Sequence, residues 1–133
     1  CSSDLTCGLA LLPAALLESC KKDDSSYAGP SNVNFSVDLS DPSYAALNNT
    51  GGYIILNSII IIRINASTFE AFSSVCTHEG CAVKYDSSST TIICPCHNGK
   101  FNASTGSVIS GPPPRPLSKY NTSLSGTILT VKS

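Results

Sequence analysis

CTHEGC (residues 76–81) and CPCHNG (residues 94–99) are the two stretches around which this chain must organise its fold. Each stretch places a histidine two or three positions after a cysteine, and each adds a second cysteine. No other histidine occurs in the 133 residues. Two thiolates and two neutral imidazoles are the donor set of a [2Fe–2S] centre in which the thiolates hold one iron and the imidazoles hold the other. The two boxes therefore indicate an electron carrier.

Two other chemistries use the same residue types. Tetrahedral zinc also accepts two cysteines and two histidines, but it would leave Cys81 and Cys96 without a role. A hydrolytic site would pair one nucleophilic cysteine with one histidine, whereas each box here carries its own histidine. We expect the iron–sulfur centre, and zinc is the alternative.

The boxes resemble those of a known family, the Rieske [2Fe–2S] proteins. Residues 76–81 match its C-T-H-x-G-C box, residues 94–97 match its C-P-C-H box, and GPPPRPL (residues 111–117) resembles the proline loop that covers the cluster. A looser similarity runs from about Gly52 to Val131. The resemblance is to the disulfide-containing branch, found in cytochrome bc-type complexes and related bacterial carriers.

That resemblance implies a role for each residue of the boxes. The four metal ligands would be Cys76 and Cys94 on one iron, with His78 and His97 on the other. A disulfide between the two ligand loops would join Cys81 and Cys96. The residues expected around the cluster are Gly80, Gly99, Phe101, Pro112 and Pro113. No catalytic residue is expected.

Two positions depart from the quinol-oxidising members of the family. Those members usually carry a serine two residues after the second histidine ligand and a tyrosine four residues after it, and both hydroxyls donate hydrogen bonds that favour the reduced cluster. Gly99 and Phe101 stand there instead. We therefore expect a lower reduction potential than in a hydroxyl-bearing relative. Gly80 and Gly99 are also expected to sit in tight turns that need a positive φ.

Composition favours a small exported domain. Charged residues make up 13% of the chain and the net charge is −1, so no basic surface for nucleic acid is expected. Seven cysteines would be unusual in the cytosol, and a disulfide needs an oxidising compartment. We expect an extracytoplasmic location, either periplasmic or at the cell surface, in a membrane-anchored protein or an assembly.

Five Asn-x-Ser/Thr sequons occur in the chain. Their asparagines are Asn34, Asn48, Asn65, Asn102 and Asn121. A chain rich in asparagine, serine and threonine makes some by chance. In an organism that glycosylates exported proteins they become candidate sites on an outward-facing surface.

The hydrophobic pattern after residue 32 is that of an all-β protein. Residues 33–39 (VNFSVDL) alternate apolar and polar side chains, and Asn57-Ser58 separates two apolar runs, residues 53–56 and 59–64, as a hairpin turn would. The IIII run (residues 59–62) predicts a central strand covered on both faces. Further strands are expected at residues 68–72, 83–85, 91–94, 117–120 and 127–131, with no substantial helix after residue 30.

These elements predict a Rieske-type fold of small antiparallel sheets. A cluster-binding lobe, about residues 72–114, would be inserted into a base lobe, and together they would form a domain over residues 33–133. Residues 1–32 would form an N-terminal apolar segment and polar linker. Its apolar run, residues 5–17 (LTCGLALLPAALL), is too short to span a bilayer and fits a signal-peptide core or a buried helix. Lipidation of Cys1 would leave Cys7 and Cys20 to pair.

Two function classes follow. In the first, the chain is an exported or membrane-attached electron-transfer protein, or a respiratory-complex subunit, whose partner is a redox protein or a quinol-oxidising membrane complex. In the second, it is a structural protein: a homo-oligomer joined through residues 1–20, forming an extracellular polymer of cluster-bearing subunits. An oxygenase subunit is excluded because its mononuclear iron needs further histidines. We expect an electron-transfer protein or an oxidoreductase subunit rather than an enzyme acting by itself.

Overall fold

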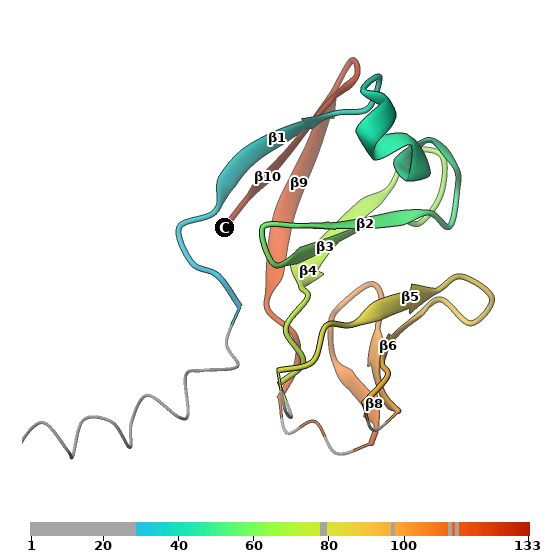
Figure 1. Ribbon diagram of the computed structural model, residues 1–133, viewed down its shortest axis with the longest axis vertical. Helices are drawn as coiled ribbons and strands as arrows, with labels where there is room; N and C mark the ends of the chain where they lie inside the picture. Colours follow the sequence, from blue (N-terminus) through green and yellow to red (C-terminus); the bar gives the residue numbers. More distant parts are fainter. Residues whose placement is uncertain (1–28, 78–79, 97, 112, 114) are drawn as a thin grey trace, which may run out of the picture.

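The computed structural model describes residues 29–77, 80–96, 98–111, 113 and 115–133. Within them lie two antiparallel sheets, one above the other (Figure 1). The elements in chain order are β1 (Asn34–Asp38), η1 (Pro42–Asn48), β2 (Tyr53–Leu56), β3 (Ile59–Arg63), β4 (Phe69–Ser73), β5 (Lys84–Asp86), β6 (Thr91–Cys94), β7 (Gly99–Asn102), β8 (Val108–Ser110), β9 (Lys119–Ser125) and β10 (Ile128–Lys132). The prediction of an all-β fold made of small antiparallel sheets is confirmed.

The larger sheet forms the base lobe. Its six strands follow the order β1-β10-β9-β4-β3-β2. The predicted hairpin between β2 and β3 is confirmed: Asn57 and Ser58 have φ values of 55° and 63°, the left-handed pair of a type I′ turn. This turn matches the right-handed twist of the flanking strands, so it sets their register.

β3 is the strand that joins the two halves of the core. Its four isoleucines are fully buried, as predicted for a strand covered on both faces. Ile60 and Ile62 pack in the core that continues into the smaller sheet, whereas Ile59 and Ile61 pack in the core of the base lobe. Because side chains alternate along a strand, one apolar run serves both cores.

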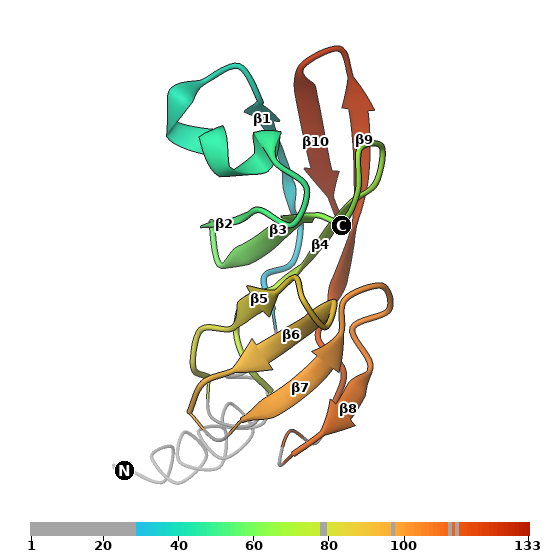
Figure 2. The same ribbon diagram turned by 90° about the vertical axis from the view of Figure 1, so that its right-hand side faces the viewer.

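The smaller sheet is inserted between β4 and β9 and has the order β5-β6-β7-β8 (Figure 2). Sequence patterns predicted β5 and β6 but not β7 and β8, whose GKFN and VIS segments are too short for an alternating pattern to identify a strand. Asp86 shapes the β5–β6 turn by accepting hydrogen bonds from the hydroxyls of Ser88 and Ser89, and these bonds lower the pKa of its carboxyl.

The short 3₁₀ helix η1 was not predicted. Its start has a sequence signal, since Asp41 accepts from the backbone N–H of Ser43 at 2.9 Å and Pro42 begins the helix. The helix covers one end of the base lobe by burying Leu47 completely, and Arg63 donates to the Leu47 carbonyl at 3.1 Å. Contacts with the base lobe thus stabilise this helix, which is too short to show helical periodicity in the sequence.

The two lobes meet at Gly106. Its φ is +79°, and a Cβ there would lie 2.8 Å from the Leu117 carbonyl oxygen and 3.1 Å from the ring of Phe72. Lys119 also bridges the lobes, because its Nζ lies 3.3 Å from Glu70 and donates to the Ser104 carbonyl at 2.7 Å. The base therefore holds the smaller sheet through packing as well as polar contacts.

This joint predicts a specific instability. Gly106→Ala adds both left-handed backbone strain and a clash, so we expect it to lower the free energy of unfolding by about 2–4 kcal/mol. Gly126→Ala is the matched control, because Gly126 has φ +62° but no atom lies within 4 Å of the place that a Cβ would take. Urea unfolding of both variants measures the difference. Equal losses would show that the joint contributes nothing beyond backbone strain.

Candidate metal centre

The first ligand loop lies between β4 and β5. The Cys76 N–H donates to the Cys81 carbonyl at 2.9 Å, and the Gly80 N–H donates to the Cys76 carbonyl at 2.9 Å. An isolated bridge between Val75 and Ala82 closes the base of the loop. Gly80 has φ +77°, so the expectation of a positive φ is confirmed there. This turn requires glycine because a side chain would strain it.

The second ligand loop is the turn between β6 and β7. Cys94 and Gly99 face each other as the last paired residues of these strands, and the intervening Asn98 has φ 59°. Cys94 is therefore fixed at the end of a strand, and the residues that follow it turn back at once. The two boxes belong to different strand connections but lie at the same end of the smaller sheet (Figure 2).

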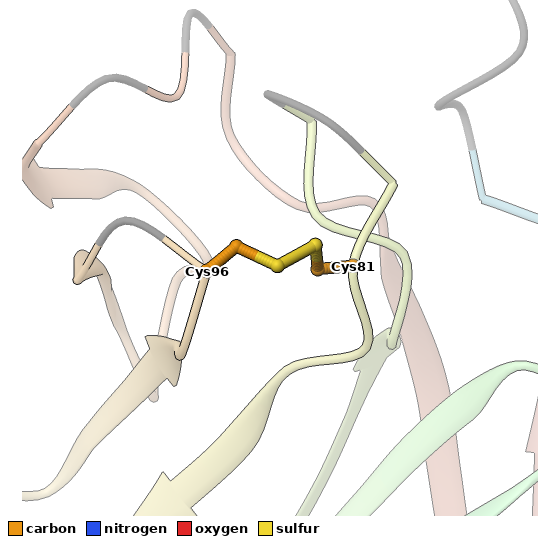
Figure 3. The surroundings of a disulfide bond; sticks show 2 residues. All are labelled: Cys81 and Cys96. Carbon is orange, nitrogen blue, oxygen red and sulfur yellow. A yellow bond between two sulfur atoms is a disulfide. The ribbon is translucent and has the colours of Figure 1, made fainter.

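A disulfide joins the two loops. Cys81 and Cys96 are bonded, with their Cα atoms 6.5 Å apart, and Figure 3 shows the link running from the loop after β4 to the residues after β6. The pairing implied by the family resemblance is confirmed. The closed loop spans 15 residues, for which the chain-entropy account gives about 3 kcal/mol of stabilisation.

The other two cysteines of the boxes lie outside the disulfide and are buried. Cys76 is 0% exposed and Cys94 is 2% exposed. The sulfurs of Cys81, Cys94 and Cys96 lie within 4.8 Å of one another. Sulfurs in a disulfide are not thiolates, so Cys76 and Cys94 are the cysteines of the two boxes whose sulfurs could bind a metal as thiolates. Buried thiols on two cross-linked loops fit an iron–sulfur cluster.

The imidazole half of the predicted donor set lies outside the described residues. This applies to His78 and His97, and also to Pro112 of the predicted cluster surroundings and to the N-terminal residues 1–28. Their roles stay predictions. Each histidine adjoins a described part of a loop, since Thr77 precedes His78 and Cys96 precedes His97.

The segment at residues 111–117 contacts both ligand loops. Thr77 Oγ1 donates to the Arg115 carbonyl at 2.7 Å, which ties the segment to the first loop. Pro113 is buried against Gly99, at the start of β7, which ties it to the second loop. We call residues 111–117 the covering loop. The loop was predicted from the sequence, but the role of Thr77 was not, because its only signal was its place between a cysteine and a histidine.

Gly99 is glycine for a different reason from the one expected. It is not among the glycines with a positive φ. A Cβ at Gly99 would instead lie 2.6 Å from Pro113 Cγ and 2.8 Å from its Cδ, and a Cβ at Gly111 would lie 2.7 Å from the Gly99 Cα. The expectation of a positive φ is therefore wrong for Gly99. The covering loop approaches so closely that it leaves no space for a side chain.

Phe101 is fully buried on β7 and belongs to the core shared by the two lobes. It pairs across the sheet with Ile92, which is also fully buried. Its ring therefore packs the interior behind the second ligand loop. Burial at this position explains an aromatic ring, and the absence of a hydroxyl leaves no polar group to satisfy in that core.

The part of the chain that contains the two ligand loops is similar to known proteins. The sequence profile of the Rieske [2Fe–2S] domain matches residues 36–121. The chain is 39% identical over 80 residues to the cytochrome b6-f complex iron–sulfur subunit of Chlorobaculum tepidum, covering 59% of this chain and 44% of that protein. It is 33% identical over 92 residues to the subunit of the same name from Prochlorococcus marinus, covering 69% of this chain and 43% of that protein. The chain thus spans less than half the length of these relatives.

Solved structures also resemble this chain in fold. The cyanobacterial plasma membrane Rieske protein PetC3 from Synechocystis PCC 6803 is similar with a TM-score of 0.56 and 28% identity, covering 76% of this chain and 99% of that one. The ferredoxin of carbazole 1,9a-dioxygenase from Nocardioides aromaticivorans IC177 has a TM-score of 0.60 at 21% identity, covering 77% and 98%, and shows likeness of fold alone. With two buried thiols, a disulfide between the ligand loops and a profile match over most of the described domain, this chain belongs to the Rieske [2Fe–2S] domain family.

Proposed function

We propose that this chain transfers single electrons as the extracytoplasmic Rieske subunit of a quinol-oxidising membrane complex. The observation that carries the proposal is the pair of buried thiols, Cys76 and Cys94, on loops that the Cys81–Cys96 disulfide holds together. In this proposal His78 and His97 complete the donor set. The bound [2Fe–2S] cluster supplies a one-electron couple, whose potential is raised by the two neutral imidazoles.

The protein's own residues hold and shield this centre. The disulfide fixes the distance between the two ligand loops, Gly80 provides the left-handed backbone that the first loop needs, and Gly99 leaves space for Pro113 of the covering loop. Pro113 and the Thr77–Arg115 hydrogen bond keep the covering loop seated. Rigid loops limit how far the ligands move when the charge on the site changes, which favours rapid electron transfer.

The location is part of the proposal. A disulfide with Cys96 exposed at the surface persists in an oxidising compartment. The relatives from Chlorobaculum tepidum and Prochlorococcus marinus are named as subunits of cytochrome b6-f complexes. Among the residues that the structure describes, no helix has the length and apolar character needed to cross a membrane. Membership of such a complex is proposed from the names of the relatives, and the oxidising compartment from the disulfide.

The cofactor and the partner are tested on the protein from its own source. We expect two irons and two sulfides per chain and an EPR signal of a reduced Rieske cluster. In isolated membranes that also hold a b-type cytochrome, we expect added quinol to produce this signal from the oxidised cluster. Stoichiometric zinc without the signal would contradict the cofactor. A cluster that quinol does not reduce in membranes would contradict the complex.

Thr77 is predicted to hold the covering loop. Thr77→Val keeps the shape of the side chain but leaves the Arg115 carbonyl without this donor, so we expect a loss of about 1–2 kcal/mol in the free energy of unfolding and faster loss of visible cluster absorbance. Thr77→Ser, which keeps the hydroxyl, is the control and should stay close to the native protein. Identical behaviour of the valine and serine variants would reject the role of this hydrogen bond.

A serine in place of Gly99 is predicted to raise the midpoint potential of the cluster, but only once space has been made for its side chain. In Gly99→Ser the new Cβ meets Pro113, so the hydroxyl effect is mixed with displacement of the covering loop. Pro113→Ala removes the two clashing carbons. In that background we expect Gly99→Ser to have a midpoint potential higher than Gly99→Ala by on the order of 50 mV, since a hydrogen bond worth about 1.5–3 kcal/mol acts partly on one redox state.

Protein-film voltammetry of the two double variants measures this difference. The alanine variant carries the same Cβ and the same change at Pro113, so only the hydroxyl separates the pair. Equal midpoints would show that backbone groups already satisfy the sulfurs on this side of the site.

A further inference from the structure

The sequons at five asparagines are more numerous than composition alone accounts for. The chain has nine asparagines, and five are followed two positions later by serine or threonine. Serine and threonine together number 33 among 133 residues, so about two of nine asparagines would have such a neighbour by chance. The five do not cluster in one low-complexity stretch but are spread from β1 to β9.

In every sequon, the asparagine and the hydroxyl residue two positions later lie on the surface. The five asparagines and the five hydroxyl residues that follow them are all exposed: Asn34 with Ser36, Asn48 with Thr50, Asn65 with Ser67, Asn102 with Ser104, and Asn121 with Ser123. A sugar attached to any of these asparagines would extend into solvent without disturbing the core. The fold therefore accepts a substituent at each site.

Two of these sites share the outer face of the base sheet. Asn34 on β1 and Asn121 on β9 both pair with Lys132, which lies on β10 between them. Residues in register share a face, so the two asparagines stand about 10 Å apart across two strand spacings. Their neighbours Ser36 and Thr130 on this face contact each other through their hydroxyls at 3.2 Å. This side of the sheet presents mostly polar side chains, with Ile128 as an exposed apolar exception, in contrast to the buried opposite face.

Two other sites repeat one motif. NAST occurs at residues 65–68 and again at residues 102–105, each time in a turn between strands. Asn65 Oδ1 accepts from the Ser67 N–H at 3.0 Å, and Asn102 Oδ1 accepts from the Ser104 N–H at 2.7 Å. Because the carbonyl oxygen is held by the turn, the amide nitrogen lies on the opposite side of the planar side chain. The turn thus presents the nitrogen that a sugar would be joined to.

The ligand loops and the covering loop carry no sequon. Asn98 is exposed in the second ligand loop, but Gly99 and Lys100 follow it. Asn102, the nearest sequon along the same strand, pairs with Thr91 at the far end of the β6–β7 hairpin, whereas Cys94 pairs with Gly99 at the ligand end. These two ends are separated by about 10 Å of strand. Figure 2 shows that the β7–β8 turn points back toward the base lobe.

We propose that this protein is N-glycosylated at these five asparagines, so that glycans cover the base lobe and the sides while the ligand end of the smaller sheet stays bare. The proposal rests on the proposed export, because the modification takes place outside the cytoplasm. The sugar donor would be a polyprenyl-phosphate-linked oligosaccharide. The asparagine Nδ2 forms a bond to the anomeric carbon and loses one proton, the bond from that carbon to the phosphate oxygen breaks, and the lipid phosphate leaves.

The distribution of the sequons over the fold suits an electron carrier exposed at a cell surface. Glycans are large, hydrated and uncharged or weakly charged, so they would protect the exposed strands from unwanted pairing and proteolysis. A glycan at Asn98 would stand between the centre and any redox partner. The distribution of sequons avoids that position although the asparagine is present.

Glycopeptide mass spectrometry of the protein purified from its own source tests the proposal. We expect oligosaccharide masses on peptides containing the five sequon asparagines, including both NAST turns, and unmodified Asn98 and Asn57 as internal controls. EPR of the same preparation reports the cluster independently. Unmodified asparagines in all five sequons would overturn the proposal, and a normal EPR signal in that sample would leave the electron-transfer function standing. A glycan on Asn98 would contradict the proposal that the ligand end of the smaller sheet carries no glycan.

A matched pair of variants made in the source organism separates the sequon from its surroundings. Ser123→Ala removes the hydroxyl required at Asn121 and should lower the intact mass by one glycan. Ser125→Ala, two residues further along the same exposed strand, should leave the mass of the glycans unchanged. Equal glycan masses in the two variants would contradict modification at Asn121.

Discussion

The link between Cys81 and Cys96 is the constraint on which the arrangement of the site depends. The two ligand loops belong to different strand connections. Secondary structure brings them to the same end of the smaller sheet, where Cys76 and Cys94 share one buried core, and the covalent bond and the covering loop add fixed links between the loops. The thiols of Cys76 and Cys94 are then buried between elements that cannot separate.

The covering loop completes that enclosure through contacts of two kinds. A hydrogen bond from Thr77 ties it to the first ligand loop, and steric fit between Pro113 and Gly99 ties it to the second. The second contact gives a physical reason for the departure from quinol-oxidising relatives. At the position where they usually carry a serine, Pro113 leaves no space for a side chain here.

The base lobe supports the site through the core that the two lobes share, since Ile60, Ile62 and Phe72 belong to the same buried cluster as Cys76 and Cys94. The isoleucines of β3 alternate between two cores, and Gly106 allows Phe72 and Leu117 to pack closely where the lobes meet. The smaller sheet is therefore held against a rigid support. The outer face of the base sheet, by contrast, carries mostly polar side chains. Tight packing and solvent exposure thus lie on opposite faces of the same strands.

Much of the fold could be predicted because its signals are local. The IIII run marked the central strand, Asn57-Ser58 marked a turn that needs left-handed backbone, and the two boxes contained the two cysteines and two histidines of the predicted donor set. Each of these rests on the chemistry or conformational preference of a few adjacent residues. The disulfide followed from a family resemblance and not from spacing alone.

Tertiary structure decided the features that depend on residues distant in sequence. Gly99 and Phe101 were interpreted as missing hydroxyls, whereas one makes room for Pro113 and the other fills the shared core. The strands β7 and β8 were invisible in the sequence because they are short and gain their stability from pairing with β6 and with each other. The sequence by itself determined the donor chemistry, since that resides in side chains. How closely the loops approach was decided by packing, because a contact distance depends on both partners at once.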